Sequence, residues 1–160
     1  LVDHGGQAVL KGCKSDGCDL MGWAVYGSGS SLTAHDSSAR SSSFANACVY
    51  SGATAHFVQC SLDNSQWCGL FASGRGTFVA ADATSISGSK RSNVCASTGA
   101  AVMISGLNRS NRFGVTAEEG RTITADAACK AKGNGKGKFC KRKGGRVVRP
   151  LARSSKCCIS

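Results

Sequence analysis

Proline is almost absent from this sequence, and the single one, Pro150, lies close to the C-terminal end. Because proline cannot donate a ladder hydrogen bond, its absence elsewhere leaves the chain free to form uninterrupted β-structure. Aromatic residues make up only 6% of the chain, so the sequence favours a core of small side chains. No apolar run approaches the roughly 20 residues that a membrane-spanning helix needs, which predicts a soluble protein.

Acidic residues are missing from the C-terminal segment, residues 130–160. This segment contains eleven Lys and Arg residues and no Asp or Glu. Residues 1–129 carry nine basic and nine acidic residues, so the net charge of +11 belongs entirely to the C-terminal segment. Highly charged segments with little apolar surface do not fold alone. We therefore expect residues 130–160 to be an irregular extension that a partner holds.

What the sequence does contain is a repeat of about 23 residues between residues 22 and 129. In each unit a glycine precedes two apolar residues that are separated by one position, such as Leu32 and Ala34. These pairs begin 23, 23, 24 and 21 residues apart, at Leu32, Ala55, Phe78, Val102 and Ile123. Alternation with a period of two indicates strands with one buried face. Three short strands in each unit are typical of one coil of a parallel β-solenoid.

Two further columns of residues keep the same register. One contains Val25, Cys48, Phe71, Cys95 and Thr116, and the other contains Ser37, Cys60, Ala83, Leu107 and Ala128. Units such as residues 67–74 and 113–117 resemble the right-handed parallel β-helix repeat of the pectate-lyase-like superfamily. The resemblance covers about two thirds of the chain. It implies architecture only, because the shared pattern is the coil and no catalytic signature accompanies it.

The predicted fold is all-β, a right-handed parallel β-helix of about five or six coils with an irregular basic C-terminal tail. Residues 1–20 are expected to form an N-terminal cap or an imperfect first coil, residues 21–129 the β-helix, and residues 130–160 the extension. An antiparallel sandwich and an accidental period are the alternatives. Three columns that keep register over five units favour the solenoid.

Ten cysteines invite the interpretation of a disulfide framework, but the columns favour buried thiols. Cys48 and Cys95 share one inward column with Phe71 between them, so they lie two coils or about 9.6 Å apart, beyond disulfide reach. Reduced thiols favour an intracellular compartment, including an organelle such as the mitochondrion, with secretion as the alternative. Residues 1–6 show no apolar signal core, so we expect any targeting segment to be absent from this stretch.

Patterns that carry catalysis or bind metals are scarce. On the 23-residue alignment Asp36 and Asp82 share a column, but no two carboxylates stand at the spacing that polysaccharide cleavage requires. His35 and His56 are expected to stack on an outward, solvated face. Cys13 is too far from the next cysteine for the usual CxxC zinc knuckle, and no second pair follows. We predict no catalytic residue, no metal site and no cofactor.

The candidate binding residues are the cations of the C-terminal segment. Lysine and arginine neutralise phosphates, and the glycines between them let the main chain approach a polyanion closely. We expect the following residues to contact an RNA backbone with little sequence specificity: Lys130, Lys132, Lys136, Lys138, Lys141, Arg142, Lys143, Arg146, Arg149 and Arg153. The solenoid, with Val79 and Met103 as an outward apolar strip, is expected to contact neighbouring proteins. The hypothesis is a noncatalytic subunit of a large assembly, such as an organellar ribosome, that binds rRNA.

Two other classes of protein stay open. One is a secreted β-helix that binds or cleaves polysaccharide, with its basic segment attracted to acidic glycans. The other is a prenylated peripheral membrane protein, because residues 157–160 match the C-a-a-X pattern, with Cys157 as the lipidated residue. A match of four residues arises easily by chance, so membrane attachment is the less favoured of these hypotheses.

Overall fold

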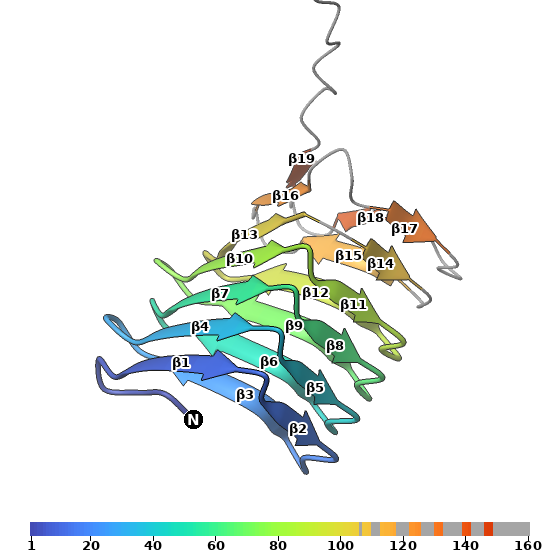
Figure 1. Cartoon of the computed structure of the whole chain (residues 1–160). Coiled ribbons are helices and arrows are strands. Elements are labelled where there is room, and N and C mark those ends of the chain that lie inside the picture. The colour runs from blue at the N-terminus through green and yellow to red at the C-terminus, as the bar shows by residue number, and fades with distance from the viewer. Residues whose placement is uncertain are drawn as a thin grey trace, which may run out of the picture.

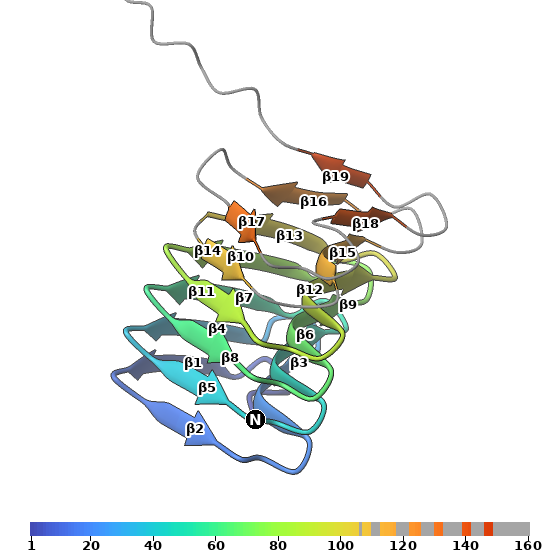
Figure 2. The same ribbon diagram turned by 90° about the vertical axis from the view of Figure 1, so that its right-hand side faces the viewer.

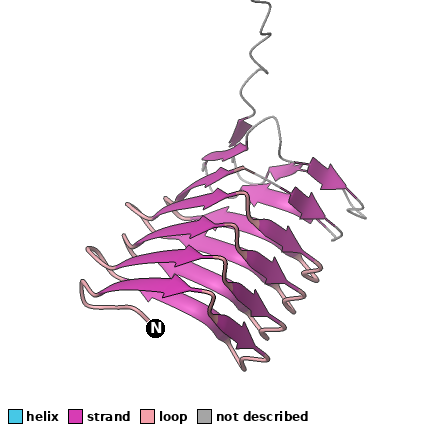
Figure 3. Ribbon diagram, viewed as in Figure 1, coloured by secondary structure: helices cyan, strands magenta, loops and turns pink. Residues whose placement is uncertain are grey.

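The computed structural model describes residues 1–105, 107–109, 113–117, 122–125, 130–132, 139–141 and 146–148. Beyond residue 105 it describes the side-chain environment at four positions, Thr116, Ile123, Thr124 and Val148. Every regular element among these residues is a strand (Figure 3), and they include no helix long and apolar enough to cross a membrane. The prediction of an all-β fold is confirmed.

The strands form three parallel sheets, in which each strand pairs with the strand three places further along the chain (Figure 1, Figure 2). Sheet I contains β1 (Gln7–Lys11), β4 (Ser31–His35), β7 (Thr54–Val58), β10 (Phe78–Asp82), β13 (Ala101–Ile104), β16 (Thr122–Ala125) and β19 (Arg146–Val148). Sheet II contains β2 (Lys14–Asp16), β5 (Ser38–Arg40), β8 (Ser61–Asp63), β11 (Ser85–Ser87), β14 (Leu107–Arg109) and β17 (Lys130–Lys132). Sheet III contains β3 (Met21–Tyr26), β6 (Ala45–Tyr50), β9 (Cys68–Ser73), β12 (Ser92–Ser97), β15 (Phe113–Ala117) and β18 (Phe139–Lys141). Because three strands complete one circuit, β1–β12 make four successive coils of a parallel β-solenoid.

Large and small side chains alternate along one interior column of the solenoid. In sheet I, Ala34, Phe57, Ala81 and Ile104 follow one another in register from coil to coil. The ring of Phe57 is fully buried and stacks on Trp23, with 5.9 Å between the ring centres and 15° between the ring planes. Coils lie about 4.8 Å apart, so a ring fits only where its neighbours above and below are small. This explains why so few aromatic residues suffice for the core.

The fourth coil differs from the predicted register by one residue. Val79, and not Phe78, is in register with Ala55. Val79 is 0% exposed and Phe78 is 39% exposed. Thr84, and not Ala83, follows Cys60 in its column, since its hydroxyl accepts the backbone N–H of Cys60 at 3.3 Å. A shift of one residue exchanges the two faces of a strand. The predictions that Phe78 faces inward and that Val79 belongs to an outward strip were therefore wrong.

The shift has a local cause in the turn that leads from sheet III to sheet I. This turn has four residues after β3 and β9 (27–30 and 74–77) but three residues after β6 and β12 (51–53 and 98–100). In the longer turns the hydroxyl of Ser30 or Thr77 accepts a hydrogen bond from the backbone N–H of a glycine in the preceding coil, at 3.0 Å in both cases. Corresponding turns recur every 47 residues, so the structural repeat is two coils long.

The ladder continues into the segment predicted to be a basic extension. β17 pairs with β14, β18 with β15 and β19 with β16, in every case in parallel. One short strand is thereby added to each of the three sheets, at the end of the stack opposite to the N-terminus (Figure 1). The other residues of 130–160 lie outside the described residues.

The packing around Gly69, in β9, leaves no room for a side chain. A Cβ atom at this position would clash with Cγ2 of Ile86 and would lie 2.8 Å from the backbone oxygen of Asn93. We expect Gly69→Ala to lower the free energy of unfolding by about 1–3 kcal/mol, because overpacking forces neighbours to move. Chemical denaturation measures this loss. Since Ile86→Ala removes the clashing methyl group, the double variant is expected to lose less than the sum of the single losses, and strict additivity would contradict the proposed clash.

Candidate functional site

Four of the predicted RNA-binding cations lie on strands at the C-terminal end of the solenoid. Lys130 and Lys132 lie in β17 of sheet II, Lys141 in β18 of sheet III, and Arg146 in β19 of sheet I. The structure thus brings cations to all three sheets at one end of the stack. The other predicted residues lie outside the described residues: Lys136, Lys138, Arg142, Lys143, Arg149 and Arg153, together with the lipidation candidate Cys157.

Sheet II carries more positive charge toward this end. Lys132 is in register with Arg109, which is itself in register with Ser87. The last three strands of the sheet, β11, β14 and β17, contain three cations and no acidic residue. One coil below β11, Asp63 accepts a hydrogen bond from the Ser87 hydroxyl at 2.6 Å. The nearest carboxylate along this column is therefore already bound to a hydroxyl group of the same sheet.

The histidines and carboxylates of sheet I do not form the predicted columns. Asp82 is in register with Val58, and Val58 with His35, whereas His56 is in register with Thr33. The predictions that Asp36 shares a column with Asp82, and that His35 stacks on His56, were wrong. The error for Asp82 has the same origin as that for Phe78, because the longer turn before β10 moves each residue of that strand by one position. The error for the histidines is separate: partners in β4 and β7 lie 23 residues apart, whereas His35 and His56 lie 21 apart.

His56 and Asp82 instead form a pair across neighbouring coils. Nε2 of His56 lies 2.7 Å from one carboxylate oxygen of Asp82, and the Ser105 hydroxyl donates to the other oxygen at 3.0 Å. The side chains of His56 and Asp82 are 44% and 52% exposed. These contacts hold the pKa of the Asp82 carboxyl below its ordinary value, chiefly through the hydrogen bond from His56 and further through that from Ser105.

The pair makes a testable contribution to the dependence of stability on pH. A carboxyl whose pKa is lower in the folded chain stabilises the fold above its unfolded pKa, and this contribution is lost as pH falls through the folded pKa. Both side chains are about half exposed, so the effect on stability is expected to be small. We expect His56→Ala to raise the pKa of Asp82 toward its ordinary value in a ¹³C NMR titration. An unchanged Asp82 pKa in this variant would contradict the pairing.

One column of thiols lies on the outer side of sheet III. Cys48, Phe71 and Cys95 are in register, as predicted, but Ala24 and not Val25 precedes them. Val25 belongs to the main core, whereas Cys48 and Cys95 belong to a separate buried cluster, so the prediction of an inward column was wrong. None of the described cysteines is paired in a disulfide. Burial raises the pKa of Cys48 to about 12, which keeps its thiol neutral.

The same face of sheet III carries an aromatic cluster that the sequence analysis missed. Phe44 stacks on Trp67 with 4.5 Å between ring centres, and Phe71 meets both rings steeply inclined, at 5.7 and 5.2 Å. The Arg91 guanidinium lies 4.6 Å from the centre of the Trp67 ring. Phe44 and Trp67 each precede a strand of sheet III, so alternation within strands could not place them. Their spacing of 23 residues is the signal that could have found them.

The chain matches no protein-family model, no curated protein and no solved structure. Its function is therefore inferred from its own residues. Three arrangements stand out among the described residues: the basic end at β17–β19, the exposed His56–Asp82 pair, and the aromatic face of sheet III. The basic end has the largest charge of the three, and like charges gathered at one place repel one another until counterions or a polyanion neutralise them.

Proposed function

We propose that this protein is a noncatalytic β-solenoid whose basic C-terminal end binds the phosphate backbone of RNA within a larger assembly, such as an organellar ribosome. One observation carries the proposal: residues 130–160 contain eleven cations and no acidic residue, and three strands within them pair onto the solenoid. Cations on a rigid end lose less conformational freedom on binding than cations on a free chain, which favours binding.

Charge alone does not give sequence specificity. Contacts to phosphates position a protein on a nucleic acid, while base edges carry the sequence information. The four cations on β17–β19 are therefore expected to bind structured RNA tightly but without strong sequence preference. Within an assembly, the neighbouring proteins that contact the solenoid would supply the specificity of placement.

The exposed pair on the body of the solenoid does not favour a catalytic role. His56 and Asp82 form a surface pair with both side chains about half exposed, whereas acid–base catalysis usually relies on shielded groups with strongly shifted pKa values.

We also propose that the coils are right-handed and of the pectate-lyase-like type, on the strength of the repeat units at residues 67–74 and 113–117. The shared feature is the coil, so the proposal extends to architecture and not to polysaccharide cleavage.

The test compares three polyanions on the full chain. Fluorescence anisotropy measures binding to a structured RNA, to polygalacturonate and to vesicles that contain an anionic lipid. We expect the RNA to bind at least ten times more tightly than polygalacturonate at the same ionic strength. Tighter binding of polygalacturonate would overturn the proposal in favour of a glycan-binding protein. Vesicle binding together with an intact mass that shows a lipid on Cys157 would overturn it in favour of a membrane protein.

A further inference from the structure

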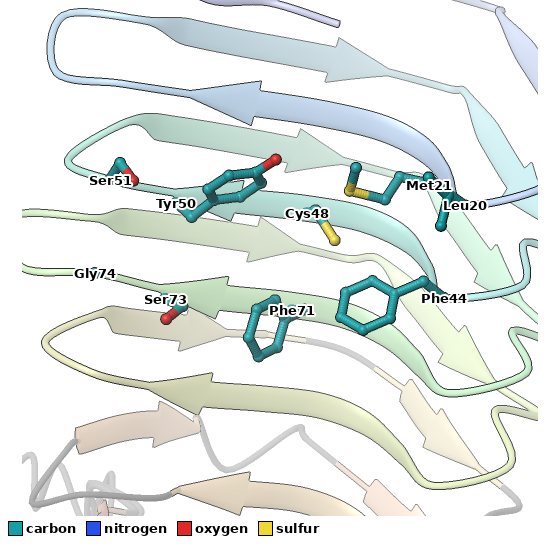
Figure 4. A pocket seen from close by; sticks show the side chains of 9 residues that line it. All are labelled: Leu20, Met21, Phe44, Cys48, Tyr50, Ser51, Phe71, Ser73 and Gly74. Carbon is teal, nitrogen blue, oxygen red and sulfur yellow. The ribbon is translucent and has the colours of Figure 1, made fainter.

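The outer face of sheet III is hollowed by a groove of about 420 Å³ that crosses β6. Three groups of residues line it, at the start, the middle and the end of the strands (Figure 4): Leu20, Met21 and Phe44; then Cys48 and Phe71; then Tyr50, Ser51, Ser73 and Gly74. A site of this volume falls within the range of about 300–1,000 Å³ that small-molecule pockets occupy.

The groove exists because Cys48 is small. Along the chain this thiol lies between Phe44, which precedes β6, and Tyr50, which ends it; in the next coil its column is occupied by the ring of Phe71. Phe71 therefore bounds the groove on the side of the third coil, next to the small Cys48. Tyr50 lines one side, and its ring packs against that of Tyr26 in the preceding coil, with 5.0 Å between the ring centres. The hollow thus results from a small residue, Cys48, at a position of the column where the next coil carries the ring of Phe71.

The lining is uncharged at neutral pH. It contains no carboxylate, amine or guanidinium group. Burial raises the pKa of the Cys48 thiol to about 12 and also raises the pKa of the Tyr50 phenol, so both groups keep their protons. An ionic ligand would lose hydration in this groove without gaining a partner of opposite charge. This excludes a fatty acid anion or a quaternary amine as the preferred occupant.

The two ends of the groove differ in polarity. Leu20, Met21 and Phe44 supply apolar surface at one end, and Leu20 is 66% exposed. The hydroxyl groups of Ser51 and Ser73 lie at the other end (Figure 4). Apolar surface left in water is unfavourable, and a hydroxyl group offers both a donor and an acceptor. The groove therefore complements a molecule with one apolar part and one neutral polar part.

We propose that this groove binds a neutral amphiphile, a small molecule with an aliphatic or aromatic body and a single hydroxyl, carbonyl or arylamine group that forms hydrogen bonds. The apolar body lies against Leu20, Met21 and Phe44, and the polar group lies beside Ser51 and Ser73. This activity is separate from RNA binding, because the groove spans the first three coils and the basic strands lie at the other end of the stack.

The test uses the neutral fluorescent probe N-phenyl-1-naphthylamine on the full chain. We expect saturable binding with an increase of probe emission, and we expect 1-decanol to displace the probe at lower concentration than decanoate does. Absence of saturable binding would overturn the proposal. Equal displacement by decanol and decanoate would also overturn it, since it would show that the groove does not distinguish a neutral from a charged head group.

Two variants locate the probe. Cys48→Phe extends the ring column of Phe71 into the groove and is expected to weaken probe binding at least tenfold. Leu20→Asp places a charge at the exposed apolar end and is expected to have a similar effect without disturbing the core. Val9→Asp is the matched control, because Val9 is also exposed (75%) and lies in the same coil but outside the lining. Equal probe affinity in Leu20→Asp and Val9→Asp would overturn the assignment of the site.

Discussion

Replacing Phe57 by alanine is expected to lower the free energy of unfolding by about 3–5 kcal/mol, the range typical of a buried ring lost from a core. Phe57 is fully buried, stacks on Trp23 and has alanines in register on both sides. Those alanines cannot fill the space that the ring leaves, so a cavity remains. Guanidinium denaturation followed by far-UV circular dichroism measures the loss.

Phe78→Ala is the matched control for this prediction. Phe78 lies in β10, the strand next to β7 of Phe57, but its side chain is 39% exposed. We expect its replacement to cost less than about 1 kcal/mol, since the side chain forms no part of the core. Equal losses in the two variants would contradict the register of the fourth coil, because the alignment by a uniform 23-residue period places both rings inside.

Replacing four cations on the last strands by glutamine is expected to weaken binding to structured RNA on the order of 10³-fold at about 0.1 M salt. The variant combines Lys130→Gln, Lys132→Gln, Lys141→Gln and Arg146→Gln. Each neutralised phosphate adds roughly 0.7–0.9 to the steepness of log K against log salt concentration. Four such contacts therefore raise the binding constant about 10³-fold when the salt concentration falls from about 1 M to about 0.1 M. Electrophoretic mobility shift measures the affinity.

A control variant with the same loss of charge separates specific placement from net charge. It combines Lys11→Gln, Lys14→Gln, Arg40→Gln and Arg75→Gln, all in the first three coils. Lys14 lies in β2, the strand of sheet II at the far end from β17. We expect the control to weaken RNA binding less than tenfold. A loss as large as that of the first variant would show that the RNA responds to the total charge of the protein and not to its basic end.

The fold could be predicted from the sequence because alternation within each strand and glycine at each corner recur together. The register of β10 could not, because the turn before it has four residues where the preceding turn has three. A uniform period selects the larger apolar residue, Phe78, whereas the chain buries Val79. Recognition of the longer repeat of 47 residues, in which Asn46 and Cys48 correspond to Asn93 and Cys95, would have corrected this.

The candidate site was predictable only where composition defines it. The cations of residues 130–160 are evident from the sequence, but their pairing as strands is not, since Lys130 and Lys132 flank a single alanine in a segment without an apolar period. The groove over β6 was missed because both faces of the sheet III strands are apolar. In β3, Trp23, Ala24 and Val25 are consecutive apolar residues, so alternation cannot tell which face is inside.

The salt dependence of RNA binding tests the proposed function most directly. The measurement compares the unaltered chain with Lys130→Gln/Lys132→Gln in β17 and with Lys11→Gln/Lys14→Gln at the opposite end of the stack. We expect the slope of log K against log salt to become shallower by about 1.4–1.8 in the β17 variant, because two phosphate contacts are lost, and to stay unchanged in the control. The same slope in all three proteins would contradict RNA binding by the basic end.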